Sequence, residues 1–437
     1  MSSEYFRRHW RTGLVLLFGL AVFIVCAGPL RPLLNYYEEC HLFRWTTAYV
    51  REQASAPGGW MEWMVSFVTQ FFYVGWLGAL VVALLCLALQ YACYWIFRLV
   101  RIGRRWAFPL SFLPVVLWFS LAFVPSRYRS EASFRQSVLF DYLARRGDWE
   151  ALLRQAEADS LLSEHAQQSA NYALAMRGRL ADDLFVLNQQ GPDGLLLDRR
   201  HTEALPLFVL SDIFFRLGLV NDAERLAFEA KQYFAANQRS GRLYRRLAEV
   251  NLVNGDSALA AKYLSVLTPT LFYRSWARQC SDVLSGKATL DSGHYYKQLE
   301  QFRLKKVDQL SPALSLRLQA LVEECPDNWL AGDYLEAYDL LRLDPERVLQ
   351  DEQLIQQTGR RLAPKAVLEC IVGDWIMKHP NDSFPVPISQ EVFDQTMFFL
   401  QTAEQTRDMM HPSLCQPPYS QSYWHYYGQS LQRLQRR

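Results

Sequence analysis

Three long apolar segments in the first 125 residues constrain the fold more than any other feature of this sequence. The first segment, residues 13–30, contains no charged residue, and the second and third, residues 66–97 and 106–124, have aromatic residues near their ends. About 20 apolar residues suffice for a helix to cross a bilayer. The segments therefore predict three transmembrane helices within a membrane domain covering residues 13–125.

The first apolar segment could also be a cleaved signal peptide, which is likewise an N-terminal apolar run. However, the bulky sequence PLRPLLNYY at its end lacks the small-x-small pattern of a cleavage site. We therefore expect this helix to remain part of the protein.

Four arginines lie in the stretch FRLVRIGRRWAF, between the second and third segments. An arginine at the centre of a membrane helix costs about 2.5–3.5 kcal/mol, and short loops rich in arginine lie on the cytoplasmic side. The N-terminus, residues 1–12, carries three more arginines. We therefore expect residues 1–12 and the arginine loop to face the cytoplasm, and the chain after residue 124 to lie outside. The residues concerned are Arg7, Arg8, Arg11, Arg98, Arg101, Arg104 and Arg105.

Residues 126–410 have the periodicity of paired helices joined at glycines. In RLYRRLAEVNLVNGDSALAAKYL, Ala248 and Ala260 lie on either side of Gly255, where two helices of a hairpin would touch. Similar passages surround Gly147, Gly178 and Gly218, so that successive glycines are 31, 40 and 37 residues apart. These distances bracket the 34-residue period of the tetratricopeptide repeat, which the passages resemble.

The predicted fold class is therefore all-α: three N-terminal transmembrane helices followed by an α-solenoid of tetratricopeptide-like helical hairpins. An aromatic C-terminal tail, residues 411–437, either docks on the last helices or serves as a free recognition segment. Stacked hairpins leave a groove that suits a peptide, and arginines among aromatic residues suit carboxylates. The alternative is a solvated helix face with ordinary charge pairs. The repeat register assigns these residues to the groove: Tyr172, Phe208, Asp212, Phe215, Arg216, Arg242, Arg245 and Glu249.

Four cysteines of the large domain follow one another at intervals of 45 residues: Cys280, Cys325, Cys370 and Cys415. Outside the cytoplasm they could form two disulfides, with three possible pairings. Alternatively they are small buried hydrophobic residues. The spacing does not match a zinc site.

Catalytic signatures are not found: the sequence has no phosphate loop, dinucleotide-binding glycines, nucleophile elbow or paired zinc histidines. We expect no cofactor and no metal. The formal net charge of +2 gives no reason to expect nucleic acid as a partner. The only candidates for acid–base chemistry lie in the first outer loop, LNYYEECHLFRW, at Glu38, Glu39 and His41.

Several passages resemble a family of Bacteroidota membrane proteins catalogued as domain of unknown function 6057. They include GGWMEWMVSFVTQFFYVGWLGALVVALL, NYALAMRGRLADDLF and FYRSWA. The resemblance implies a bacterial inner membrane protein whose helical repeats lie in the periplasm. It supplies no catalytic residues.

We therefore expect a membrane-anchored interaction protein of the cell envelope, whose partners are the lipid bilayer and an unidentified protein or peptide. The alternative is an enzyme, or an enzyme subunit, acting on a lipid-linked or envelope glycan substrate at the membrane.

Overall fold

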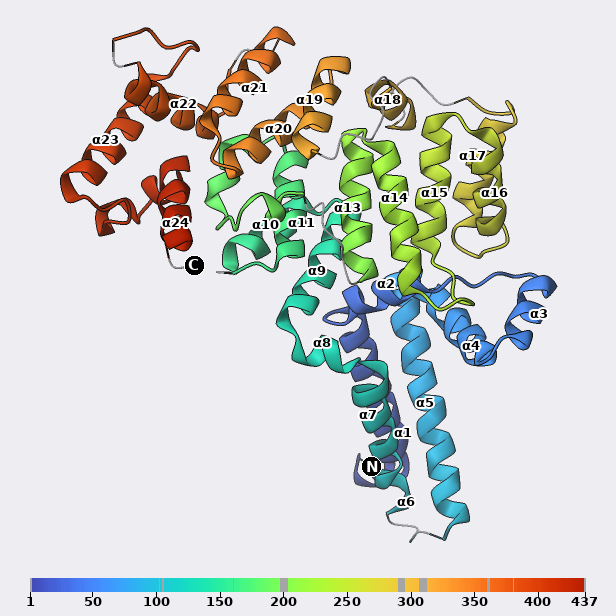
Figure 1. Ribbon diagram of the computed structural model, residues 1–437. Coiled ribbons are helices and arrows are strands. Elements are labelled where there is room, and N and C mark those ends of the chain that lie inside the picture. The colour runs from blue at the N-terminus through green and yellow to red at the C-terminus, as the bar shows by residue number, and fades with distance from the viewer. Residues whose placement is uncertain are drawn as a thin grey trace. The chain divides into compact units, whose positions relative to one another are not determined.

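The computed structural model describes residues 2–101, 103, 106–159, 161–196, 203–289, 295–305, 313–359, 362–379 and 381–435. Arg104 and Arg105 of the arginine loop lie outside these ranges. All regular secondary structure in the described ranges is helical (Figure 1), which confirms the all-α class. The chain forms two compact units. The first comprises residues 1–142, 234–248 and 261–288, and the second comprises residues 143–233, 249–260 and 289–437.

The first unit contains the apolar segments and the loop that follows the first of them. The boundary between the units falls within α9 (Ala132–Arg146), α15 (Gly241–Asn254) and α16 (Ser257–Leu267). The helices wholly within the first unit are α1 (Ser2–Ala27), α2 (Arg31–Cys40), α3 (Thr47–Ser55), α4 (Gly59–Thr69), α5 (Gly75–Leu99), α6 (Ala107–Leu110), α7 (Phe112–Trp118), α8 (Ser126–Ser130) and α17 (Arg274–Leu284).

Two helices in the described part of the chain are long and apolar enough to cross a membrane, at Trp10–Ala27 and Gly75–Leu99. The predicted number of three is therefore corrected to two. The second span also begins later than predicted, because Val74 has an extended backbone and separates α5 from α4 and the short 3₁₀ turn that follows it.

The third predicted span, residues 106–124, is a broken helix. It consists of α6, α7 and the π-helical turn η2 (Phe119–Phe123). Its apolar helical part, Ala107–Leu121, is shorter than the roughly 20 residues of a full crossing. At the break, Gln90 of α5 donates a hydrogen bond to Ser111 Oγ (2.8 Å), and Ser111 donates to Phe108 O (2.6 Å). These bonds satisfy polar groups that apolar surroundings would otherwise leave unpaired.

The broken helix nevertheless runs the length of α1, in the opposite direction. Figure 1 shows α1, α5 and the α6–α7 segment side by side, with α6 beside the N-terminal part of α1. Trp10 of α1 packs edge-to-face on Phe108, with ring centroids 5.5 Å apart, and Tyr37 of α2 packs on Phe123 in the same way at 6.1 Å. The chain therefore returns to the end of this bundle at which α2 lies.

The second unit consists of helices joined by short turns. Its elements are α10 (Trp149–Ala158), α11 (Glu164–Met176), α12 (Leu180–Asp183), α13 (Ala204–Leu217), α14 (Val220–Ala230), α18 (Tyr295–Phe302), α19 (Leu314–Glu324), α20 (Trp329–Leu341), α21 (Pro345–Gln357), α22 (Lys365–Lys378), α23 (Gln390–Thr406) and α24 (Tyr423–Gln435).

The hairpin of α13 and α14 follows the predicted pattern. Gly218 ends α13 with φ of +96°, a left-handed conformation that costs glycine little. Ala223 and Ala227 of α14 are fully buried, and Ser211 of α13 donates a hydrogen bond to Ala223 O (2.8 Å). Gly255, also at positive φ, joins α15 to α16 as predicted. The copy around Gly178 is degenerate, because its second helix, α12, has only four residues.

The C-terminal tail docks on the last helices of the second unit. Tyr423, Trp424 and Tyr426 at the start of α24 are buried, and α24 contacts α22. All eight cysteines lie within the described residues and are free. Cys280, Cys325 and Cys370 are buried, in agreement with the interpretation as small core residues, whereas Cys415 is exposed and does not fit it.

Candidate functional site

The predicted groove residues of the second unit differ in exposure. Phe208 and Phe215 on α13 are buried, whereas Asp212 and Arg216 on the same helix are half-buried. The Arg216 guanidinium lies over the ring of Tyr295, 4.1 Å from the ring centroid. Arg216 is therefore held in a cation–π contact at a partly accessible position.

Two further groove residues of this unit have aromatic neighbours. Tyr172 is half-buried and packs edge-to-face on Trp149, with ring centroids 5.3 Å apart. Glu249 is buried and accepts a hydrogen bond from the Tyr296 hydroxyl (2.9 Å). The Glu249 carboxylate therefore has an internal partner.

Arg242 and Arg245 belong to the first unit and have different surroundings. Arg245 is half-buried, and its guanidinium lies 5.1 Å from the ring centroid of Trp276. Arg242 is only 6% exposed and lies between two buried carboxylates. It donates two hydrogen bonds to Asp141 (2.7 and 2.9 Å) and one to Glu39 (2.8 Å). We call these three residues, Glu39, Asp141 and Arg242, the buried ion triad.

The buried ion triad and two neighbouring hydrogen bonds connect the start of α15, and the residues just before it, to the end of α2. Ser240 Oγ donates to Glu39 O (2.6 Å), and Gln238 Nε2 donates to Cys40 O (3.0 Å). Burial raises the pKa of the Cys40 thiol to about 12, so this cysteine is not a nucleophile at neutral pH. The bidentate contact to Asp141 fixes the guanidinium plane as well as its distance. This cluster is therefore a structural joint within the first unit.

The three residues proposed for acid–base chemistry are separated by the fold. Glu39 is part of the buried ion triad, and Glu38 is buried. His41 instead pairs with Glu62 of α4, with 2.9 Å between Nδ1 and Oε1, and both side chains are 15% exposed. A histidine oriented by a carboxylate is suited to proton transfer. The partner Glu62 was not predicted, because it lies 21 residues further along the chain.

An apolar cavity of about 350 Å³ adjoins the His41–Glu62 pair. Its walls come from α4, α5 and the end of the broken third segment, and its polar edge includes Tyr37 and His41. Residues that form the apolar walls include Val65, Val68, Val82, Leu85, Trp118 and Phe123. We call this space the interhelix cavity.

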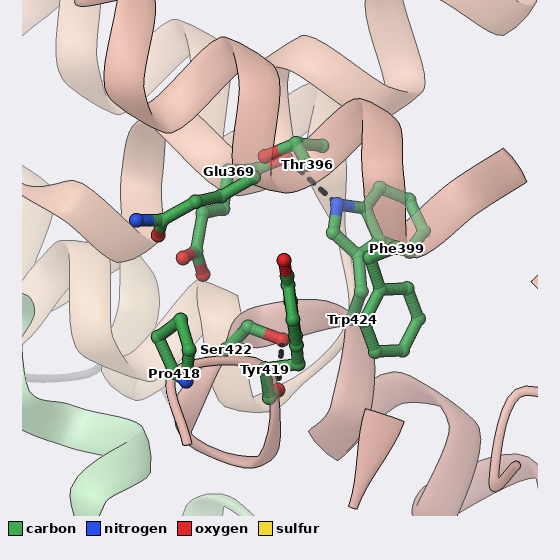
Figure 2. Close-up of a pocket in the computed structure, with 8 residues that line it drawn as sticks. Glu369, Thr396, Phe399, Pro418, Tyr419, Ser422 and Trp424 are labelled. Atoms are coloured by element: carbon green, nitrogen blue, oxygen red, sulfur yellow. Dashed lines mark hydrogen bonds between the residues drawn. The ribbon is translucent and has the colours of Figure 1, made fainter. Parts of the chain in front are cut away.

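The second unit contains a much smaller space around Glu369 of α22 (Figure 2). Its volume is about 10 Å³, which is roughly the room that one water molecule needs. Glu369 Oε2 accepts from the Tyr423 backbone N–H (2.8 Å), and the Trp424 indole N–H donates to Glu369 O (2.9 Å). Burial raises the pKa of Glu369 to about 7. Glu369 therefore caps α24 and joins it to α22, which is a structural role.

A pair of buried carboxyl groups joins α20 to α21. Asp339 and Asp351 are almost fully buried and hydrogen-bond to each other. Burial raises the pKa of both groups, for Asp351 to about 8, and the neighbouring Asp339 carboxyl raises the pKa of Asp351 further. Within the described ranges, no three His, Cys, Asp or Glu side chains form a group that could hold a metal ion.

In its described part the chain is an all-α protein with two helices that are long and apolar enough to span a bilayer, and the interhelix cavity is lined partly by one of them. More specifically, the chain belongs to the Family of unknown function (DUF6057), whose sequence model matches residues 8–134 and 123–430. This match confirms the family that the sequence passages resemble. No curated protein and no solved structure matches the chain.

Proposed function

We propose that this protein is a membrane-anchored helical scaffold of the cell envelope that binds a protein or peptide partner. The observation that carries the proposal is a pair of partly accessible arginines stacked on aromatic rings, Arg216 on Tyr295 and Arg245 on Trp276. A guanidinium that lies over an aromatic ring is held in place by the ring, and a guanidinium is the group that binds carboxylates through paired hydrogen bonds. Such arginines are common at the centres of protein interfaces.

The arrangement of helices in hairpins supports a tetratricopeptide-like α-solenoid. In this proposal Tyr172, Asp212 and Arg216 of the second unit contact the partner, because their side chains are partly accessible. Arg245, which is also partly accessible, is a separate candidate contact on the first unit. The other residues assigned to the groove keep the helices in place, because they are buried: Phe208, Phe215, Arg242 and Glu249.

The proposed location is the bacterial inner membrane, with the helical hairpins in the periplasm. This topology requires the broken third segment to cross the bilayer beside α1 and α5, although it is too short to count as a span by itself. Its contacts with α1 at one end and with α2 at the other support that crossing. Alkaline phosphatase fused after Arg437 should be active, because the enzyme folds only outside the cytoplasm. Fluorescence of a green fluorescent protein fusion at the same position, without phosphatase activity, would place the hairpins in the cytoplasm and refute this topology.

Partner binding can be tested by in-cell crosslinking of the Arg216→Glu/Arg245→Glu variant. We expect this variant to lose the crosslinked partner, because a reversed charge repels the carboxylates that arginine attracts. The control is Arg225→Glu on α14, the second helix of the same hairpin, where the arginine is 46% exposed and pairs with Glu229 (3.6 Å). Identical crosslinked products in the double variant and in the wild type would contradict the proposal.

The hydrogen bond between His41 and Glu62 favours a second candidate function, in an enzyme or enzyme subunit acting on a lipid-linked or envelope glycan substrate. In this function His41 would transfer the proton and Glu62 would orient its ring. His41→Ala and Glu62→Ala should then each fail to restore normal growth to a strain that lacks this protein, although both variants accumulate normally. Normal growth with both variants would exclude this function. Glu39→Ala is not informative here, because it breaks the buried ion triad.

A further inference from the structure

The interhelix cavity lies partly within the apolar span of the first unit. Val82 and Leu85, which line it, belong to Gly75–Leu99, one of the two helices long enough to cross a membrane. If the chain is anchored in a bilayer, as proposed above, this wall lies at the depth of lipid chains rather than of water. A ligand that enters from that side must therefore be hydrocarbon.

The opposite wall is built by an unusual piece of backbone. Trp118, which directly precedes the π-helical turn η2, and Phe123, the last residue of that turn, line the cavity. π-Helical turns are rare and concentrate at functional sites. The Tyr37 hydroxyl donates a hydrogen bond to Phe123 O (2.9 Å), which fixes the end of this turn and leaves the tyrosine ring at the cavity edge. The aromatic wall is therefore held in place.

The volume of the cavity suits a single lipid chain. An apolar cavity of roughly 150 Å³ admits benzene, which has six carbons, so this volume scales to about a dozen carbons. The interhelix cavity has about 350 Å³ and almost entirely apolar walls. This capacity is close to most of one fatty acyl chain.

The polar edge of the cavity can receive a lipid headgroup. His41 Nδ1 lies 2.9 Å from Glu62 Oε1, which orients the imidazole ring. In the tautomer that donates from Nδ1 to this carboxylate, Nε2 is an acceptor. Both side chains are partly exposed. An ammonium or hydroxyl group of a headgroup could donate hydrogen bonds to Nε2 and to Glu62.

We propose that the interhelix cavity binds one acyl chain of a membrane phospholipid, with a hydrogen-bond-donating headgroup such as phosphatidylethanolamine at the His41–Glu62 end. The proposal rests on the membrane anchoring proposed above. It adds a specific lipid site to that anchor, and it does not depend on the protein partner.

The test uses the full chain in vesicles of phosphatidylethanolamine and phosphatidylglycerol, with some phosphatidylethanolamine carrying a diazirine on one acyl chain a few carbons from the headgroup. After irradiation, peptide mass spectrometry locates the lipid adducts. We expect adducts on Val65 and Val68 of α4, inside the cavity, as well as on outward-facing side chains such as Leu84. Flotation of the vesicles is measured first, so that a chain that does not float refutes the anchoring itself.

Two substitutions at Val68 separate the cavity from the general lipid surface. Val68→Trp should remove the adducts on α4 by filling the cavity, whereas Val68→Ala should keep them. The matched control is Leu84→Trp, a position on α5 that is 55% exposed, which should leave the α4 adducts unchanged. Unchanged protection of Cys40 from alkylation shows that the first unit of each variant is folded.

Three outcomes would overturn the proposal in a chain that floats with the vesicles. The first is the absence of adducts on α4 in the wild type, and the second is their persistence in Val68→Trp. The third is their displacement by an added polyprenyl phosphate but not by unlabelled phosphatidylethanolamine, which would assign the cavity to a prenyl chain.

Discussion

Replacing Arg242 by methionine tests the buried ion triad directly. Glu39 and Asp141 are 1% and 5% exposed, so removing the guanidinium leaves two buried carboxylates without their shared partner. Breaking a buried ion pair by deleting one member costs about 3–5 kcal/mol. We therefore expect Arg242→Met to weaken the first unit by about this amount at neutral pH.

The thiol of Cys40 reports this loss, because it is fully buried beside the triad. If alkylation requires local opening, each 1.4 kcal/mol of destabilisation raises the labelling rate about tenfold. A loss of 3–5 kcal/mol therefore predicts an increase of about 10²- to 4 × 10³-fold in the labelling of Cys40, measured by peptide mass spectrometry. Cys370 of the second unit is also buried and serves as the internal control.

A triple variant, Arg242→Met with Glu39→Gln and Asp141→Asn, separates charge from packing. Replacing all members of a buried ion cluster by uncharged residues of similar size is often nearly neutral. The triple variant should therefore recover most of the protection of Cys40. Labelling of Cys40 that stays within threefold of wild type in Arg242→Met would refute the reasoning that the triad holds this unit together.

Three further predictions concern the second unit, each measured by chemical denaturation followed by circular dichroism. Glu369 holds its proton more tightly in the native state (pKa about 7) than in the unfolded chain (4.5), so stability should fall as pH rises through this window. Glu369→Gln should abolish that fall, which amounts to at most about 3 kcal/mol, and a wild-type stability that does not change across the window would contradict the assignment. Asp351→Asn should make the second unit more stable than wild type by an amount that grows as pH rises from 3.8 to about 8, because the buried aspartate ionises over this range and asparagine does not. A difference between variant and wild type that is equal at both ends of this range would exclude titration as the cause. Gly255→Ala should lower the free energy of unfolding by about 1 kcal/mol, because alanine is strained at the positive φ of this position. Gly218→Ala should lower it by about 1–3 kcal/mol more, because the added Cβ would also collide with Phe302 O. Equal losses in the two glycine variants would mean that this collision has no effect.

Features encoded by neighbouring residues were predictable from the sequence. Hydropathy over a window of about 20 residues located the two apolar spans, although α5 begins nine residues later than predicted because Val74 is extended. The glycines at positions 218 and 255 were predicted as turns, since a left-handed backbone is a local requirement that glycine meets best. The burial of Ala248 and of Ala260 was predicted because helices that touch need small side chains.

Features that depend on distant residues were not predictable. Arg242 was assigned to a groove from its helical register, but its partners lie 101 and 203 residues away in the sequence. The interhelix cavity is formed by four separate segments, and the π-helical turn beside it leaves no signal in hydropathy. A burial preference can be predicted from a periodic pattern, whereas a specific ion pair requires the three-dimensional arrangement.

The length of chain between Glu39 and Arg242 has a consequence for biosynthesis. Ribosomes add about 5–20 residues per second, so the 203 residues that separate the two side chains take roughly 10–40 s to synthesise. During this interval α1 and α5 have already emerged, and both carboxylates must stay hydrated because their counter-charge does not yet exist. A nascent chain that stops before residue 242 therefore cannot complete its first unit, and its two carboxylates, which lack the Arg242 guanidinium, distinguish it from the finished protein.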